Sequence, residues 1–244
     1  MEVLYITPKT PYKKGDEEQK KSYNQIYNFV TEGVKVDCIF LNDNFYYLSP
    51  SSNIIEQSFN SSDIEIKKMN KSYKLMLQYL VKDIPFQIMK NYSEELKGII
   101  EKCLESKDYN VVHIHYSLMF NLHDIDWGNA KVIVDYFDPL SLKIKRKYED
   151  TINTITRLFL REELQRLIKY ERMIMGKFEN GIVYTITDKN ELSDRTNSNN
   201  LKMIPNVLQE DDEKRNKQEN YPIKNLLYLY SIFLNDQRTR VENE

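Results

Sequence analysis

The sequence has little glycine and cysteine, and it lacks a long apolar run. Only six glycines occur in 244 residues, and one of them, Gly15, lies in the loop after the first apolar segment. The two cysteines, Cys38 and Cys103, lie far apart in apolar contexts, so we expect reduced core thiols in a cytoplasmic protein. No apolar stretch reaches the roughly 18 residues of a membrane-spanning helix. The N-terminus also lacks a basic segment followed by an apolar one, which argues against a signal peptide.

Charge and motif content exclude further classes of function. The net charge is −2, so no overall basic field is available to bind nucleic acid. Serine-nucleophile, P-loop and zinc signatures are absent. His113 and His115 share one strand face, but no third ligand follows at a useful spacing, so we predict no metal site. Hydrophobic residues make up 41% of the chain, which is enough for a substantial core.

Apolar runs alternate with amphipathic stretches from the start of the chain. Residues 3–6 read as a buried strand that ends at a proline-containing loop. Residues 17–31 have the spacing of a helix with one apolar face, and Gly33 is expected to end it. A second strand follows over 34–41. A strand–helix–strand unit of this length predicts two parallel strands.

The same alternation continues to about residue 205. Residues 42–90 are less clear, with loop signals in the first part and an expected helix over 72–90 that breaks near Pro85. We expect a helix with its apolar stripe over 96–104, strands near 109–116 and 131–137, and one long helical region over 141–177. A strand after Gly181, a short helix capped by Thr187 and a strand over 201–205 follow. The expected buried face of the long region consists of Ile152, Ile155, Phe159, Leu164, Leu167, Ile168 and Ile174.

This order predicts an α/β fold, a Rossmann-like parallel sheet with helices on both faces. Ligands of such sheets bind beyond the carboxyl ends of the strands. The rule selects four candidate stretches: Thr7–Lys21, His113–Ser117, Asp135–Ser141 and Thr187–Asp188.

Stretches at these strand ends, taken in order, resemble the N-terminal half of retaining glycosyltransferases of the GT-B fold, glycosyltransferase family four. They are VLYITPKTPYKKGDEEQKKSYNQI (3–26), KDYNVVHIHYSL (107–118), VIVDYFDPLSLKIKRKY (132–148) and RLIKYERMIMGKFENGIVYTITDKNEL (166–192), followed by MIPNV (203–207). The resemblance implies one half of a GT-B fold over residues 1–208. Residues 209–222 then form a charged linker, and 223–244 are a remnant of the first strand of a second domain that is largely missing.

The resemblance implies sugar transfer from a nucleotide-sugar to a glycan, lipid or protein acceptor, as in polysaccharide biosynthesis. The family's second domain binds the nucleotide-sugar. We therefore expect no tightly bound cofactor and no activity from this chain alone unless that domain is supplied. The alternatives are a non-catalytic, degenerate partner subunit of a glycosyltransferase complex and the product of a disrupted gene. Expected partners are a second glycosyltransferase subunit or another copy of the chain, and peripheral membrane contact is compatible with this reading.

Residue roles also follow from the resemblance. Asp138 and Asp135 are placed where the family has a catalytic or acceptor-contacting group. The alternative is that Asp138, before Pro139, makes a local turn bond to the following backbone. Substrate contacts are assigned to His115, Ser141, Arg146 and Thr187, while His113 is read as a core residue and His123 as a surface residue. Arg146 belongs to a basic group with Lys143, Lys145 and Lys147, which suits an anionic acceptor, a lipid phosphate, a membrane surface or simply a solvated helix face.

The chain departs from the family pattern at the phosphate-binding loop. Glu17 and Glu18 stand where members usually have two glycines that let the backbone approach the donor phosphates. Two carboxylates would repel and obstruct a diphosphate, so the loop that includes Gly15 is read as degenerate. In folding terms, the acids complement the dipole of the helix that they begin. Val207 and Tyr230 also replace family glycines.

Overall fold

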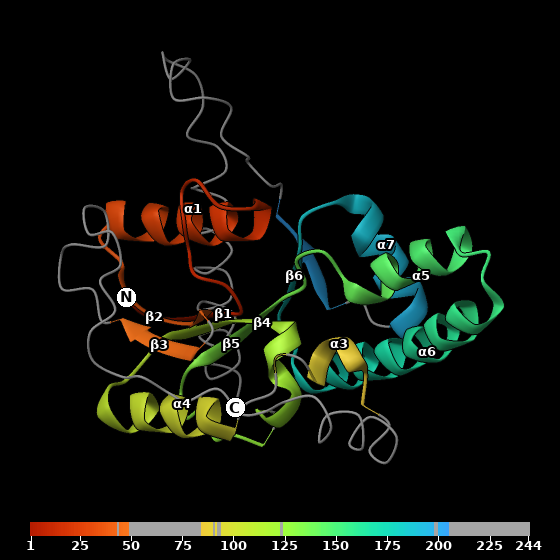
Figure 1. Cartoon of the computed structure of the whole chain (residues 1–244). Coiled ribbons are helices and arrows are strands. Elements are labelled where there is room, and N and C mark those ends of the chain that lie inside the picture. The colour runs from red at the N-terminus through yellow and green to blue at the C-terminus, as the bar shows by residue number, and fades with distance from the viewer. Residues whose placement is uncertain are drawn as a thin grey trace, which may run out of the picture.

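The computed structural model describes residues 1–42, 44–48, 84–89, 91, 94–122, 124–197 and 200–204. Its centre is a seven-stranded sheet with the order β3-β2-β1-β4-β5-β6-β7 (Figure 1). The strands are β1 (Glu2–Thr7), β2 (Lys35–Asn42), β3 (Asn44–Leu48), β4 (Val111–His115), β5 (Lys131–Asp135), β6 (Gly181–Val183) and β7 (Leu201–Met203). Six strands are parallel, which confirms the α/β prediction, and β3 alone runs antiparallel to its neighbour β2.

Helices cover both faces of the sheet. They are α1 (Glu17–Thr31), α3 (Phe86–Met89), α4 (Glu94–Ser106), η1 (Tyr116–Asn121), α5 (Leu140–Asp150), α6 (Thr154–Lys177) and α7 (Ile186–Thr196). Alternate side chains of β1 divide the core, because successive strand residues point to opposite faces. Tyr5 packs in the cluster that contains α1, whereas Leu4 and Ile6 pack in the larger cluster that contains α4 and α6. Figure 1 shows α1 and α4 on opposite sides of the sheet.

The predicted bounds of α1 are confirmed, and its two ends have clear local causes. At the start, Asp16 is the N-cap residue and forms a capping box with Gln19. At the other end, Gly33 adopts a φ of +75°, a left-handed conformation that favours glycine, and its N–H donates to Val30 O at 3.0 Å. Both cysteines are buried free thiols, as expected.

The predicted single helix over 141–177 is wrong, because the structure divides it into α5 and α6. Asn153 begins α6 by accepting a hydrogen bond from Thr156 N–H at 3.0 Å. The expected buried face is correct for Leu167 and Ile174 but wrong at the start of α6. There Ile152 is 96% exposed and Ile155 is 81% exposed. The physical reason is visible in Figure 1, where α5 and the start of α6 extend past the edge of the sheet.

The expected cap of α7 also needs correction. The helix begins earlier than predicted, and the capping oxygen is Thr185 Oγ1, which accepts from Asp188 N–H at 3.0 Å. Thr187 lies in the first turn instead and is exposed. The helix begins earlier because β6 ends at Val183, which places the cap at Thr185, two residues before the predicted cap at Thr187.

Several predictions fall on residues outside those that the structure describes. These are the linker over 209–222, the strand remnant over 223–244, the family departures at Val207 and Tyr230, and the surface position of His123. The domain boundaries therefore stay predictions. Among the described helices, none is both long enough and apolar enough to cross a bilayer.

Candidate functional site

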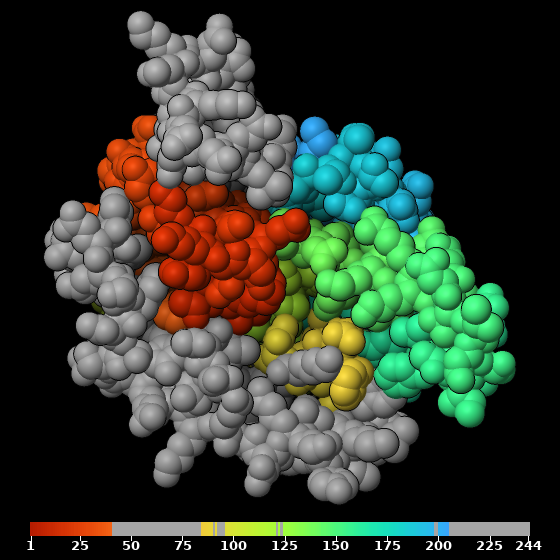
Figure 2. All heavy atoms as spheres, turned by 45° about the horizontal axis from the view of Figure 1, so that its top comes forward, coloured from red at the N-terminus to blue at the C-terminus, as the bar shows by residue number. Residues whose placement is uncertain are grey.

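A cavity of about 490 Å³ lies at the carboxyl ends of β1, β4 and β5. Its walls come from the segments after these strands, from the start of α1 and from α3 with the residue Asn91 that follows it, which we call the α3 region. Figure 2 shows the hollow between the red N-terminal segment, the green segments and the yellow α3 region. The lining residues are Pro8, Lys9, Asp16, Glu17, Glu18, Gln87, Asn91, His115, Ser117, Phe137, Asp138, Leu140 and Lys143. Three of the four stretches selected from the sequence thus meet at one place.

The amino end of α1 forms one wall of this cavity, and a capping box bonds two of its N–H groups. Gln19 N–H donates to Asp16 Oδ1 at 3.0 Å, and Asp16 N–H donates to Gln19 Oε1 at 3.1 Å. Lys9 Nζ lies 2.7 Å from Asp16 Oδ2 and 3.0 Å from Glu18 Oε2. Burial lowers the pKa of Lys9, but the two carboxylates outweigh this effect and raise it. A helix terminus that usually attracts anions is therefore already occupied by acids and a paired lysine.

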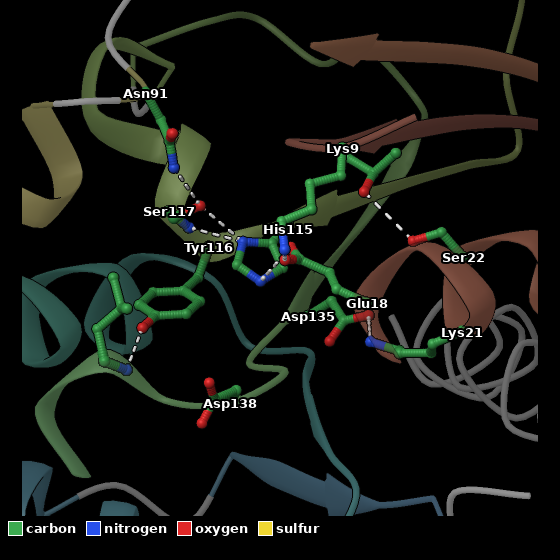
Figure 3. Close-up of polar contacts among 12 residues, drawn as sticks. Lys9, Glu18, Lys21, Ser22, Asn91, His115, Tyr116, Ser117, Asp135 and Asp138 are labelled. Atoms are coloured by element: carbon green, nitrogen blue, oxygen red, sulfur yellow. Dashed lines mark hydrogen bonds and ion pairs between the residues drawn. The ribbon is translucent and has the colours of Figure 1, made fainter. Parts of the chain in front are cut away.

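A chain of hydrogen bonds orients His115 at the end of β4, beside the start of α1 (Figure 3). Asn91 Nδ2 donates to Ser117 Oγ at 3.0 Å, and Ser117 Oγ lies 2.7 Å from His115 Nδ1. The N–H of Ser117 also donates to Nδ1, at 3.3 Å, so Nδ1 acts as an acceptor and the neutral ring carries its proton on Nε2. Nε2 lies 3.7 Å from Glu18 Oε1. Burial lowers the pKa of His115, with Glu18 opposing it, so the ring is neutral at pH 7.

Asp138 lies at the rim of the cavity in an unusual backbone conformation. Its φ is +48°, which is uncommon for a residue other than glycine. The carboxylate is about half exposed and accepts from Lys143 Nζ at 2.9 Å. Together with Asp16, Glu17 and Glu18, it makes four carboxylates on the lining, against two lysines that are both paired with them. The cavity therefore has an acidic lining.

Asp135 lies beneath the cavity and not within its lining. Its Oδ2 accepts from Lys21 Nζ at 2.5 Å and from Tyr184 Oη at 2.7 Å, and it lies 3.0 Å from His113 Nε2. All four side chains are buried. The Lys21 ammonium also lies 3.8 Å from the centroid of the Tyr184 ring, a cation–π contact. The structure thus separates the two predicted catalytic aspartates: Asp138 lines the cavity, and Asp135 is enclosed.

The charges in this buried cluster are set by burial and by direct contact. Burial lowers the pKa of Lys21 to about 8, although Asp135 opposes it. Burial would raise the pKa of Asp135, but Lys21 and His113 outweigh this effect and hold it far below its usual range. Burial also lowers the pKa of His113, so its neutral ring donates to Asp135. His113 is a core residue, as predicted from the sequence.

The other predicted contact residues lie outside the cavity lining. Ser141 is fully buried, and its N–H donates to Glu171 Oε1 at 3.2 Å. Arg146 and Thr187 are exposed on α5 and α7. Gly15 lies in the turn before α1, where its N–H donates to Tyr12 O at 3.1 Å. Glu17 and Glu18 do line the cavity.

Sequence reasoning missed the contribution of Gln87 and Asn91. Gln87 lies in α3 and Asn91 just after it. The helical spacing of this stretch is visible in the sequence, but nothing local places it against the ends of the strands. The structure shows how this region is held: the buried Glu163 of α6 accepts from the N–H groups of Phe86 and Gln87, both at 2.9 Å. Because Glu163 is 76 residues from Gln87 in sequence, no local signal could have indicated the pairing.

Within the described residues, no group of three His, Cys, Asp or Glu side chains is placed to hold a metal ion. No model of a known protein family matches the chain, and no curated protein matches its sequence. The arrangement itself can bind a small polar molecule through the carboxylates, the imidazole of His115 and the amides of Gln87 and Asn91.

Proposed function

We propose that this chain is the acceptor-side half of a glycosyltransferase with the GT-B fold, and that the cavity binds a sugar-bearing acceptor. One observation carries the proposal. The cavity lies at the carboxyl ends of β1 and β4, and the strand order reverses between these two strands. Ligands of parallel α/β sheets bind at such a switch point. The family resemblance of the same strand ends supplies the expected chemistry.

The lining suits hydroxyl-rich molecules. Carboxylates accept hydrogen bonds from sugar hydroxyls, and the amides of Gln87 and Asn91 can donate as well as accept. In this proposal, Asp138 is the polar group nearest the reacting centre, because it projects at the rim where a second domain would face the cavity. His115 contacts an acceptor hydroxyl through the ring edge that carries Nε2. Ser141, Arg146 and Thr187 do not line the cavity and would need a rearrangement to reach this ligand.

In this proposal the nucleotide-sugar donor binds to a second domain, which does not belong to the described residues. The amino end of α1 favours this assignment, because the N–H groups of Asp16 and Gln19 are already bonded within the capping box and Glu18 lines the cavity beside them. A diphosphate would have to displace these bonds and overcome like-charge repulsion. The chain alone is therefore proposed to be inactive toward nucleotide-sugars.

Ligand-observed NMR tests acceptor binding in the full chain. Neutral monosaccharides and disaccharides should show saturation transfer with dissociation constants near ~1 mM, about −4 kcal/mol. The variant Asp138→Asn should weaken the signal, whereas the matched Asp150→Asn, at an exposed position on α5, should not. Equal signals from wild type and Asp138→Asn for every sugar would count against the cavity as the acceptor site.

A second candidate is a non-catalytic partner subunit of a glycosyltransferase complex, and the acidic lining at the expected phosphate position favours it. A neighbouring reading frame that encodes a donor-binding second domain would favour a split enzyme, whereas a complete glycosyltransferase there would favour the partner role. Both versions include a cytoplasmic location with peripheral membrane contact. In both, the open cavity wall is covered by a second subunit or by another copy of the chain. A strict monomer in sedimentation at high concentration would contradict self-association.

A further inference from the structure

The connection between α5 and α6 exposes a cluster of large apolar side chains. Ile152 is 96%, Ile155 81%, Leu158 61% and Phe159 43% exposed. These four are among nine exposed large hydrophobic residues in the described chain, yet they fall within eight consecutive positions. Single exposed apolar residues are ordinary, but such a concentration marks an interaction surface. We refer to these four residues as the apolar tip.

The apolar tip has a defined shape. Ile155, Leu158 and Phe159 are spaced i, i+3, i+4 and so lie on one side of α6. The Arg157 guanidinium lies 4.9 Å from the centroid of the Tyr148 ring and joins the end of α5 to the start of α6. Figure 1 shows this helical pair extending past the sheet, so the tip can approach a flat surface without obstruction by the described core.

Both basic and acidic residues lie close to the apolar tip in sequence. Residues 146–162 contain four Lys or Arg and three Asp or Glu. Two of these acids are paired within their own helix, Glu149 with Lys145 at 4.0 Å and Glu162 with Arg166 at 3.0 Å. Arg146, Lys147 and Arg161 are exposed and form no ion pair with another described residue. Their charge is therefore available to an anionic partner.

We infer that the apolar tip and the exposed basic residues near it dock this protein on an anionic lipid surface. Apolar side chains that enter the acyl boundary while Lys and Arg contact headgroup phosphates are the physical basis of interfacial binding. Four apolar side chains are also a small patch for a stable protein interface, which buries about 800 Å² on each partner. The inference does not depend on sugar transfer. Of the residues on α5 and α6, the cavity lining includes only Leu140 and Lys143, both in the first turn of α5.

Vesicle co-sedimentation of the full chain tests the inference. We expect binding to phosphatidylcholine vesicles that contain about a third phosphatidylglycerol, little binding to pure phosphatidylcholine, and release at high salt. The variant Ile152→Ser/Ile155→Ser should lose most of the bound fraction. Both side chains are exposed, so the fold should persist, and circular dichroism checks this. The matched control is Ile186→Ser, which alters another exposed isoleucine, on α7.

The charge contribution has its own variant. Arg146→Gln/Lys147→Gln should lower vesicle affinity about fivefold for each residue, whereas Lys20→Gln/Lys102→Gln on α1 and α4 should leave it unchanged. Equal binding by the apolar-tip variant and wild type would overturn the inference, as would equal binding to neutral and anionic vesicles. The inference would also be overturned if the protein does not bind vesicles and forms dimers that the Ile152→Ser/Ile155→Ser variant does not form. That result would assign the apolar tip to contact with a second copy of the chain.

Discussion

Lys21 Nζ lies 2.5 Å from Asp135 Oδ2, and neither side chain has appreciable contact with solvent. The pair joins α1 to the end of β5, directly under the cavity. Tyr184 and His113 contact the same oxygen, Oδ2, whereas the buried Oδ1 has no hydrogen-bond partner among the described residues. This cluster fixes the position of α1 relative to the sheet and hence the position of the acids in the cavity wall.

The variant Lys21→Met should be strongly destabilised. Removal of one partner leaves Asp135 as a buried, uncompensated charge, and such losses cost about 3–5 kcal/mol. Urea unfolding measures the difference. Lys20→Met, at the exposed neighbouring position, is the matched control. The double variant Lys21→Met/Asp135→Asn should recover part of the loss, because no charge then remains unpaired. A Lys21→Met protein as stable as the control would show that the pair has no role in stability.

Glu171 should make stability depend on pH. Burial raises its pKa to about 7, although contacts with Ser141 and Arg195 oppose this. The folded state therefore binds more protons than the unfolded state between about pH 4.5 and pH 7, so stability falls as pH rises through this window, by about 3 kcal/mol. Glu171→Gln keeps an oxygen for Ser141 N–H but cannot ionise. Its melting temperature should exceed that of wild type at pH 8 and approach it at pH 5.

An exposed acid supplies the control for this pH profile. Glu179→Gln removes a carboxylate of the same type from the loop before β6, where it is in contact with water. Its profile should follow that of wild type. If Glu171→Gln and Glu179→Gln give parallel profiles, the buried carboxylate is not the source of the pH dependence.

Glu163 should hold the α3 region in the cavity wall. Its carboxylate accepts from two backbone N–H groups, and hydrogen bonds to a charged acceptor contribute about 1.5–3 kcal/mol each. Glu163→Gln replaces one acceptor oxygen with a donor, so we expect a loss of about 2 kcal/mol in unfolding free energy. Glu162→Gln, one residue earlier and paired only at the surface with Arg166, should cost far less. Equal losses in the two variants would contradict this role.

Donor binding should be absent from the isolated chain. Calorimetry with uridine- and guanosine-diphosphate sugars should give no heat of binding, because the amino end of α1 is capped and acidic. A dissociation constant near ~10 μM, about −7 kcal/mol, would contradict the prediction. Turnover of these sugars by the purified chain would contradict it equally.

Most of the fold was predicted from the spacing of apolar residues and from the alternation of strands and helices along the chain. The apolar stripe of α4 and the parallel strands were visible, because the buried positions of these elements recur at regular spacings. The bounds of α1 were also predicted, but of its expected apolar face, Tyr23, Ile26, Tyr27 and Val30, only Ile26 is buried. The strand β3 was missed, because the stretch that contains it gave no clear pattern. The exposed start of α6 was misread for a physical reason: apolar spacing indicates an amphipathic helix but not whether core lies beside it.

The candidate site was predictable in place but not in detail. The rule that ligands bind beyond parallel strands selected the residues after β1, β4 and β5, and these residues line the cavity. It did not distinguish the accessible Asp138 from the enclosed Asp135, because Asp135 ends β5 and Asp138 follows it by only three residues. The decisive partner of Asp135 is Lys21, 114 residues away, and a single sequence gives no sign of such a pairing.

The capping box at the start of α1 has a consequence for molecular selection. An uncapped helix N-terminus offers N–H donors and so binds hydrogen-bond acceptors. The start of α1 instead presents the carboxylate oxygens of Asp16, Glu17 and Glu18. This part of the cavity wall therefore accepts hydrogen bonds where an uncapped helix would donate them. Hydrogen-bond donors such as polyols or amines complement it, whereas anions are repelled by its carboxylates.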